Sequence, residues 1–114
     1  MKGILEEKSF QFAIRIINLN RFLMDTKQEY VLSKQILRSG TSIGANIAEA
    51  QFAQSKADFV SKMYISLKEA SETRYWLQLL EASNLIDNTQ LESLLSDCNE
   101  LINMLVSTCK TSKQ

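Results

Sequence analysis

The sequence predicts an all-α protein that folds as an antiparallel up-down four-helix bundle. The 114 residues include no proline and only three glycines, whereas a sheet protein needs turn residues roughly every 8–12 positions. Apolar residues recur throughout at the spacing of three and four that marks one face of a helix. The breaks between these segments are only about 3–6 residues long, and helices joined by such short links run antiparallel. We therefore expect a single domain over residues 1–114, with helices at about 4–24, 27–52, 56–82 and 88–109.

The first two predicted helices are separated by the sequence DTKQE. Thr26, followed three residues later by Glu29, has the form of a capping box, which predicts that the second helix begins at residue 27. The inward stripe of the first helix is Leu5, Phe12, Ile16, Leu19 and Leu23. The stripe of the second is Leu32, Ile36, Gly40, Ile43, Ile47 and Ala50.

Capping signals also precede the third and fourth helices. Ser55 with Asp58 predicts the start of the third helix, and Asp87 with Gln90 predicts the start of the fourth. The stripe of the third helix is Phe59, Met63, Leu67, Ala70, Leu77 and Leu80. The fourth has the most regular stripe, with Leu91, Leu94, Leu95, Cys98, Leu101, Ile102, Leu105 and Cys109.

The stretch SGTSIGANIAEA, residues 39–50, is unusually rich in small residues. A phosphate-binding loop is excluded because the G-x-x-x-x-G-K-[ST] spacing and a preceding strand are both missing. A flexible linker is excluded because Ile36, Ile43 and Ile47 keep one helical phase through it. We interpret the stretch as a helix whose small residues let another backbone come close. That packing would offset a cost of roughly 1 kcal/mol for each glycine relative to alanine.

A polar stripe lies beside the apolar stripe of the second helix. Small and amide-bearing side chains in such a stripe fit a place where another helix approaches and hydrogen bonds must be satisfied. Arg38 and Glu49 lie about three turns apart, so each should meet a group on a neighbouring helix or subunit rather than the other. The stripe consists of Gln35, Arg38, Ser42, Asn46 and Glu49.

The chemical inventory argues against an enzyme. The chain has no histidine, which removes the usual general base and both the Ser-His-Asp and Cys-His types of catalysis. Cys98 and Cys109 cannot form a structural zinc site alone and stand roughly 16 Å apart on one helix, so we expect reduced packing residues. Glu69 and Glu72 are interpreted as a solvated helix face. We therefore predict no catalytic, cofactor-binding or metal-ligating residue, and no small-molecule substrate.

Neither a run of about 18 apolar residues nor a signal-peptide pattern occurs, so we expect a cytoplasmic protein without a membrane partner. The formal net charge is zero, yet residues 1–68 hold ten basic against six acidic side chains. Residues 69–109 hold one basic against seven acidic side chains. Two explanations stay open. The charges form ordinary solvated faces, or a basic surface of one protomer meets an acidic surface of another.

The first and third helices carry more apolar residues than a bundle core requires. An exposed apolar patch usually marks an interface, although amphipathic tyrosines also tolerate exposure. The candidate oligomer interface consists of Phe10, Ile14, Tyr64 and Tyr75.

The second helix also carries a motif that resembles a known family. Proteins encoded within intervening sequences of bacterial 23S rRNA genes, often called S23 ribosomal proteins, share approximately Q-x-x-R-x-x-x-S-I-P-x-N-I-A-E-G. Two positions differ here, because Gly44 replaces the common proline and Ala50 the final glycine. The resemblance extends over about Glu6 to Val106. The matching residues are Gln35, Arg38, Ser42, Ile43, Asn46, Ile47, Ala48 and Glu49.

The resemblance implies a closed antiparallel bundle that assembles into a ring-like homopentamer without established enzymatic activity. A related bundle, the accessory protein of diversity-generating retroelements, is a basic pentamer that works with a reverse transcriptase and nucleic acid. We therefore expect a non-enzymatic, homo-oligomeric interaction or scaffold protein. The alternative is an accessory protein that binds RNA or DNA through a basic face of the ring. Its candidate phosphate contacts are Lys8, Arg15, Lys27, Lys34, Lys56 and Lys62.

Overall fold

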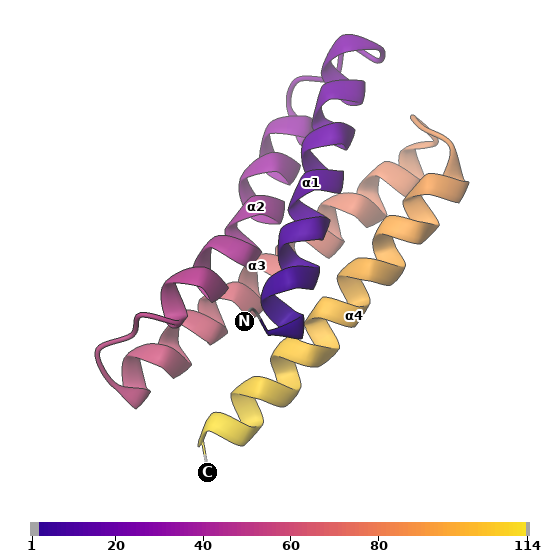
Figure 1. The fold of residues 1–114 in the computed structure, drawn as a ribbon. Coiled ribbons are helices and arrows are strands. Elements are labelled where there is room, and N and C mark those ends of the chain that lie inside the picture. Colours follow the sequence, from indigo (N-terminus) through magenta and orange to yellow (C-terminus); the bar gives the residue numbers. More distant parts are fainter. Residues whose placement is uncertain (1–2, 114) are drawn as a thin grey trace.

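The computed structural model describes residues 3–113, which form four helices and no strand (Figure 1). The helices are α1 (Ile4–Asp25), α2 (Leu32–Ala50), α3 (Lys56–Ser83) and α4 (Asn88–Lys113). Successive helices run in opposite directions, and the bundle measures 44 × 24 × 20 Å. The all-α class with four helices is confirmed. The last helix continues beyond its predicted end at residue 109.

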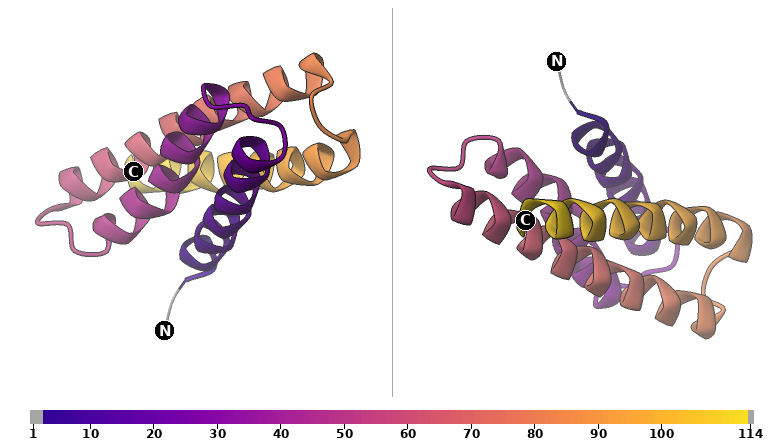
Figure 2. Two further views of the ribbon diagram at one scale, coloured as in Figure 1. Left: turned by 90° about the horizontal axis from the view of Figure 1, so that it is seen from above. Right: turned by 90° about the horizontal axis from the view of Figure 1, so that it is seen from below.

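The four helices contact one another in a cycle in which α1 and α3 lie on one diagonal. Helix α2 packs against α1 and α3, and α3 packs against α4, while the contact between α1 and α4 is the smallest of the four. Figure 2 shows the reason, because the N-terminal end of α1 points away from α4. Helix α1 is therefore held mainly by α2.

The core consists largely of the residues at the predicted stripe positions. Ile16 and Leu23 of α1, Ile36 and Ile43 of α2, and Leu77 of α3 are fully buried. The α4 positions Leu91, Leu94, Cys98, Leu101, Leu105 and Cys109 are buried as well. The stripe residues Leu5, Leu32, Phe59, Leu67 and Leu95 are partly buried and pack at the margin of the core.

The connection between α1 and α2 corrects the predicted start of the second helix. Gln28 adopts a left-handed conformation with φ 54°, which interrupts the helical backbone, and α2 begins only at Leu32. Thr26 ends α1, since its N–H donates to the carbonyl of Phe22 at 2.9 Å. The Glu29 carboxylate caps α2 by accepting hydrogen bonds from the N–H groups of Val31, Leu32 and Ser33 at 3.1, 3.0 and 2.8 Å.

The caps of the other two helices lie close to their predicted positions. Ser55 Oγ accepts from the N–H of Asp58 at 3.1 Å, and the Asp58 carboxylate accepts from the N–H of Gln54 at 3.2 Å. Before α4, the Asp87 carboxylate accepts from the N–H of Thr89 at 3.2 Å. Asn84 ends α3 in a left-handed conformation with φ 57°.

Helix α2 comes very close to α1 at Gly40. A Cβ atom at this position would lie 2.8 Å from both Cγ1 and Cγ2 of Ile16, which is too close for any real contact. At Gly44, one turn further, a Cβ atom would lie 3.3 Å from Ser9 Oγ. The small residues therefore let the two helices approach, as their pattern in the sequence predicts.

Replacing Gly40 by alanine should destabilise the protein by about 1–2 kcal/mol, because overpacking against Ile16 outweighs the better helix propensity of alanine. Gly44→Ala is the matched control and should stay within about 1 kcal/mol of the wild type, since its closest contact, 3.3 Å to Ser9 Oγ, requires a shift of only a few tenths of an ångström. Urea denaturation measures the free energy of unfolding of both variants. Equal stability of the two variants would contradict the close approach at Gly40.

Glu29→Ala should cost about 1 kcal/mol at pH 7 because the first turn of α2 loses its acceptor. Burial alone would raise the pKa of the Glu29 carboxyl, but the hydrogen bonds from Leu32, Ser33 and Val31 outweigh it and hold the pKa below its ordinary value of 4.5. The contribution is therefore present above pH 4.5 and is lost as the pH falls below it.

Urea denaturation at pH 7 and at pH 3 checks this dependence, and the difference between wild type and Glu29→Ala should shrink at the lower pH. Glu92→Ala, at an exposed position of α4, is the control and should have little effect at either pH. A Glu29→Ala effect that does not change with pH would contradict the carboxylate cap.

Candidate functional site

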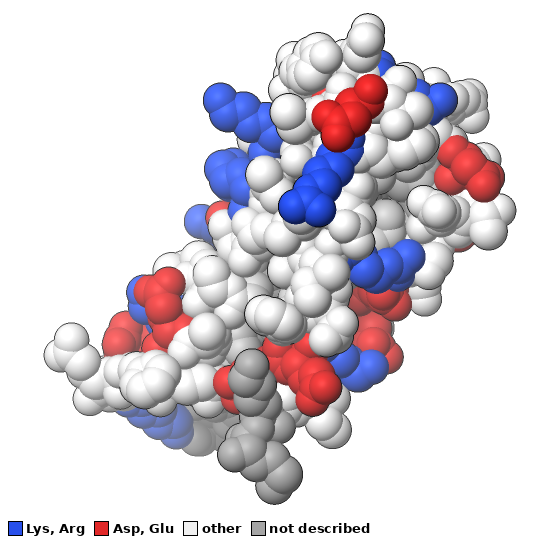
Figure 3. All heavy atoms as spheres, turned by 45° about the horizontal axis from the view of Figure 1, so that its top comes forward, with Lys and Arg blue, Asp and Glu red and all other residues white. Residues whose placement is uncertain are grey.

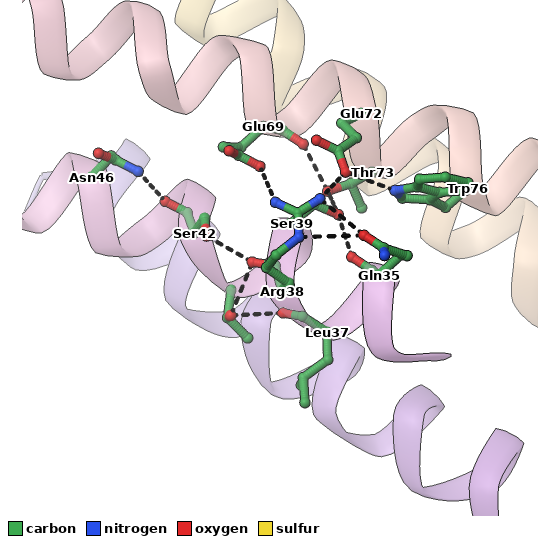
Figure 4. A network of polar contacts seen from close by, with 11 residues as sticks. Gln35, Leu37, Arg38, Ser39, Ser42, Asn46, Glu69, Glu72, Thr73 and Trp76 are labelled. Atoms are coloured by element: carbon green, nitrogen blue, oxygen red, sulfur yellow. Dashed lines mark hydrogen bonds and ion pairs between the residues drawn. The ribbon is translucent and has the colours of Figure 1, made fainter. Parts of the chain in front are cut away.

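The family-motif residues of α2 fall on two sides of the helix. Ile43 and Ile47 enter the core, where both are buried. The polar stripe lies along the edge that faces α3 (Figure 4). Arg38 is the largest of these polar side chains and has about half of its surface exposed.

Arg38 joins α2 to two carboxylates of α3. Its Nη1 lies 3.4 Å from Glu69 Oε2, and its Nη2 donates to Glu72 Oε2. Gln35 Oε1 accepts from the Nε and Nη2 of Arg38 at 3.3 and 3.2 Å, which orients the guanidinium. Trp76 Nε1 donates to the same Glu72 oxygen at 2.9 Å. Glu69 and Glu72 are therefore partners of Arg38, which corrects their interpretation as a solvated face.

Beneath this ion pair lies a layer of buried hydroxyl groups that the sequence did not single out. Thr73 Oγ1 lies 2.9 Å from Ser39 Oγ, which links α3 to α2, and Ser66 Oγ donates to the carbonyl of Ile43 at 2.8 Å. Every buried side-chain nitrogen and oxygen among residues 3–113 has a partner. The sequence held one signal for these buried hydroxyl groups, because Ser66 and Thr73 occupy inward positions of the third apolar stripe at helical spacing.

The middle and the end of the polar stripe behave differently. Ser42 Oγ donates to the Arg38 carbonyl at 2.7 Å, and Asn46 Nδ2 donates to the Ser42 carbonyl at 2.8 Å, so both side chains bond their own helix. Glu49 pairs with Lys62 of α3 at 3.1 Å. Arg38 and Glu49 were each expected to meet a group on a neighbouring helix or on another subunit. In the structure both meet a neighbouring helix, α3. Arg38 and Glu49 thus hold α2 against α3 within one chain.

The buried thiol of Cys98 is poorly suited to act as a nucleophile. Burial raises the pKa of the Cys98 thiol to about 12, and Cys98 Sγ lies 3.4 Å from the Ala70 carbonyl oxygen, so the thiol stays neutral at physiological pH.

Among residues 3–113 no three His, Cys, Asp or Glu side chains come together in a way that holds a metal ion. Within the same range, no helix has the length and apolarity that crossing a membrane requires.

The basic first half and the acidic second half of the sequence meet within one chain. Lys8 pairs with Glu100 at 2.9 Å and Arg15 with Asp97 at 2.6 Å, so two ion pairs join α1 to α4. The hydrogen bond and the charge of Glu100 raise the pKa of Lys8. Part of the segregated charge therefore has partners inside the protomer. Lys8, Arg15 and Lys62 are engaged with carboxylates and are less available to phosphate groups.

A second group of cations lies at the end of the bundle where α1 and α2 are joined. Arg21, Lys27 and Lys34 form no ion pair with a carboxylate of residues 3–113. Lys27 Nζ lies 5.9 Å from the centroid of the Phe22 ring. Figure 3 shows several blue side chains toward the top of this face, with red side chains beside them, while red and blue alternate lower down. Sequence analysis missed Arg21, and it included Lys56, which lies at the start of α3 at the opposite end.

The candidate interface residues belong to two separate surfaces. Phe10 and Tyr75 are each 55% exposed, and Ile14 and Tyr64 are also exposed. Because α1 and α3 lie on a diagonal, Phe10 and Ile14 form one surface and the tyrosines form another. The Tyr75 ring packs edge-on against Trp76 with centroids 5.3 Å apart. Exposed Ile17 and Ile65 extend the two surfaces, and neither was predicted.

These features define a four-helix protein whose polar groups chiefly hold its helices together. The chain belongs to the 23S rRNA-intervening sequence protein family, whose model matches residues 3–107. It is similar to a crystal structure from Bacteroides thetaiotaomicron VPI-5482, a protein of unknown function from the S23 ribosomal protein family. The two share 53% identity and a TM-score of 0.91, over 94% of this chain and 96% of the other. Among curated proteins no match occurs.

Arg38 and Glu72 should be energetically coupled. A double-mutant cycle with Arg38→Met and Glu72→Gln should give a coupling of about 0.5–1 kcal/mol, because the pair is partly shielded and shares the hydrogen bond from Trp76. The matched control is a cycle on Lys8 and Glu100, a more exposed pair, where the coupling should be smaller. Coupling measured by urea denaturation that is no larger for Arg38 and Glu72 would contradict a structural role of this network.

Proposed function

We propose that the protein is a non-enzymatic, homo-oligomeric scaffold, and specifically a homopentamer. One observation carries this proposal: the chain exposes two different apolar surfaces on the diagonal helices α1 and α3. A soluble monomer rarely exposes large apolar side chains in continuous patches. A ring needs two distinct surfaces on every protomer, one for each neighbour.

The polar contacts support a structural rather than a catalytic protein. Three carboxylates between α2 and α3 are bound by cations, Glu69 and Glu72 by Arg38 and Glu49 by Lys62. The thiol of Cys98 is buried and neutral, so it is a poor nucleophile. The resemblance to the intervening-sequence family favours the pentamer among the closed rings.

Size-exclusion chromatography with light scattering tests the assembly. A pentamer should have a mass of about 65 kDa, five times the 13.0 kDa of one chain. The mass should stay constant as the protein is diluted through the column, since each protomer in a closed ring is held by two contacts. A wild-type mass near 13.0 kDa would overturn the proposal.

A second candidate function, binding of single-stranded RNA or DNA, is favoured by the cations at the end where α1 meets α2. Arg21, Lys27 and Lys34 have no carboxylate partner among residues 3–113. Tyr30 and Phe22 are exposed in the same region, and aromatic rings beside cations suit the stacking of unpaired bases. A ring would repeat this cluster once per protomer and so strengthen weak individual contacts.

Fluorescence anisotropy with a labelled single-stranded RNA tests this second function. Binding should weaken steeply as salt increases, and the double variant Lys27→Ala/Lys34→Ala should lower both the affinity and the salt dependence. Lys62→Ala is the matched control, because Lys62 is already paired with Glu49. Binding that is absent, or that salt leaves unchanged, would reject this function.

A further inference from the structure

The outer face of α1 carries an apolar ridge made of Phe10, Ile14 and Ile17. These residues are spaced four and three apart, so they lie in one row, and all three are exposed. The row points away from the core, which Phe12 and Ile16 enter from the other side of the helix. We call this row the α1 ridge.

The outer face of α3 carries a shallow hollow of about 510 Å³ toward α4. Half-buried Leu67 and buried Ile102 give it an apolar lining, and Tyr64 and Ile65 are its exposed apolar members. Tyr75 continues the same face, since it follows Tyr64 by three helical turns. We call this surface the α3 hollow. It offers a concave apolar surface to a row of side chains from a helix.

The beginning of the ridge and the α3 hollow carry opposite charges, whereas Arg21 lies at the other end of the ridge. Lys68 and Arg74 line the α3 hollow, and Lys68 forms no ion pair with a carboxylate of residues 3–113. Glu6 and Glu7 lie in the first turn of α1, one turn before Phe10. Contact between the ridge and the hollow would therefore bring acidic groups toward basic groups, which favours this pairing over either surface meeting its own kind.

A single chain cannot make this contact, because α1 and α3 lie on a diagonal of the bundle. We infer that the α1 ridge of one copy packs into the α3 hollow of the next copy, as ridges fill grooves when helices pack. The inference rests on the proposed homo-oligomer and specifies its interface. The contact joins two unlike surfaces, so it runs head to tail and leaves one ridge and one hollow open until the ring closes.

Mixing two interface variants tests the pairing. Ile14→Asp disables only the ridge, and Ile65→Asp disables only the hollow. Each variant alone should run near the 13.0 kDa of a monomer with unchanged helical circular dichroism. In an equimolar mixture, the intact hollow of the first variant meets the intact ridge of the second. The mass should then rise toward that of a dimer and no further, because both remaining surfaces are disabled.

Phe52→Asp is the control, since Phe52 is 89% exposed in the turn between α2 and α3 and belongs to neither surface, and it should keep the wild-type mass. If an aspartate variant loses helicity, Ile14→Ser and Ile65→Ser replace it without adding charge. An oligomeric wild type whose variants stay assembled, or whose mixture stays monomeric, would overturn the pairing alone. A monomeric wild type would overturn the homo-oligomer and the pairing together.

Discussion

The close contact between Gly40 of α2 and Ile16 of α1 sets the geometry on which the rest of this bundle depends. Because position 40 has no side chain, Ile16 fills the space there and α1 packs directly against the backbone of α2. The other side of α1 has only a small contact with α4, where the ion pairs from Lys8 and Arg15 lie. Helix α1 can therefore lean outward and present its apolar ridge without losing its place in the core (Figure 2).

The polar contacts divide the same bundle into regions with different tasks. Between α2 and α3, Arg38 and the hydroxyl of Thr73 satisfy partners that would otherwise be desolvated, and this makes the helix pair specific rather than merely apolar. Where α1 is joined to α2, Lys27 and Lys34 lack carboxylate partners among the residues described. The outer faces of α1 and α3 carry the exposed apolar side chains of the α1 ridge and the α3 hollow. Folding contacts, unpaired cations and the proposed self-association thus involve different parts of the molecule.

Much of this arrangement could be predicted from the sequence, because each helix carries a periodic apolar stripe and the small-residue stretch of α2 keeps one helical phase. Other features depend on geometry that spacing does not encode. The start of α2 was misplaced because the Glu29 carboxylate caps the helix while Gln28 takes a left-handed backbone conformation. The basic first half and the acidic second half could be recognised in the sequence. Only the packing of α1 beside α4 shows that some of these charges meet within one chain.

Hydroxyl-radical labelling of the assembled wild-type protein tests the central claim most directly, because aromatic side chains report their own exposure. Phe10, Tyr64 and Tyr75 should react slowly if they lie between copies, whereas Phe52 and Tyr30 should react as their exposure of 89% and 58% predicts. Dilution below the assembly concentration should raise the reactivity of the first three only. Phe10 and Tyr75 that always react as readily as Tyr30 would contradict the account, since these surfaces would then face water.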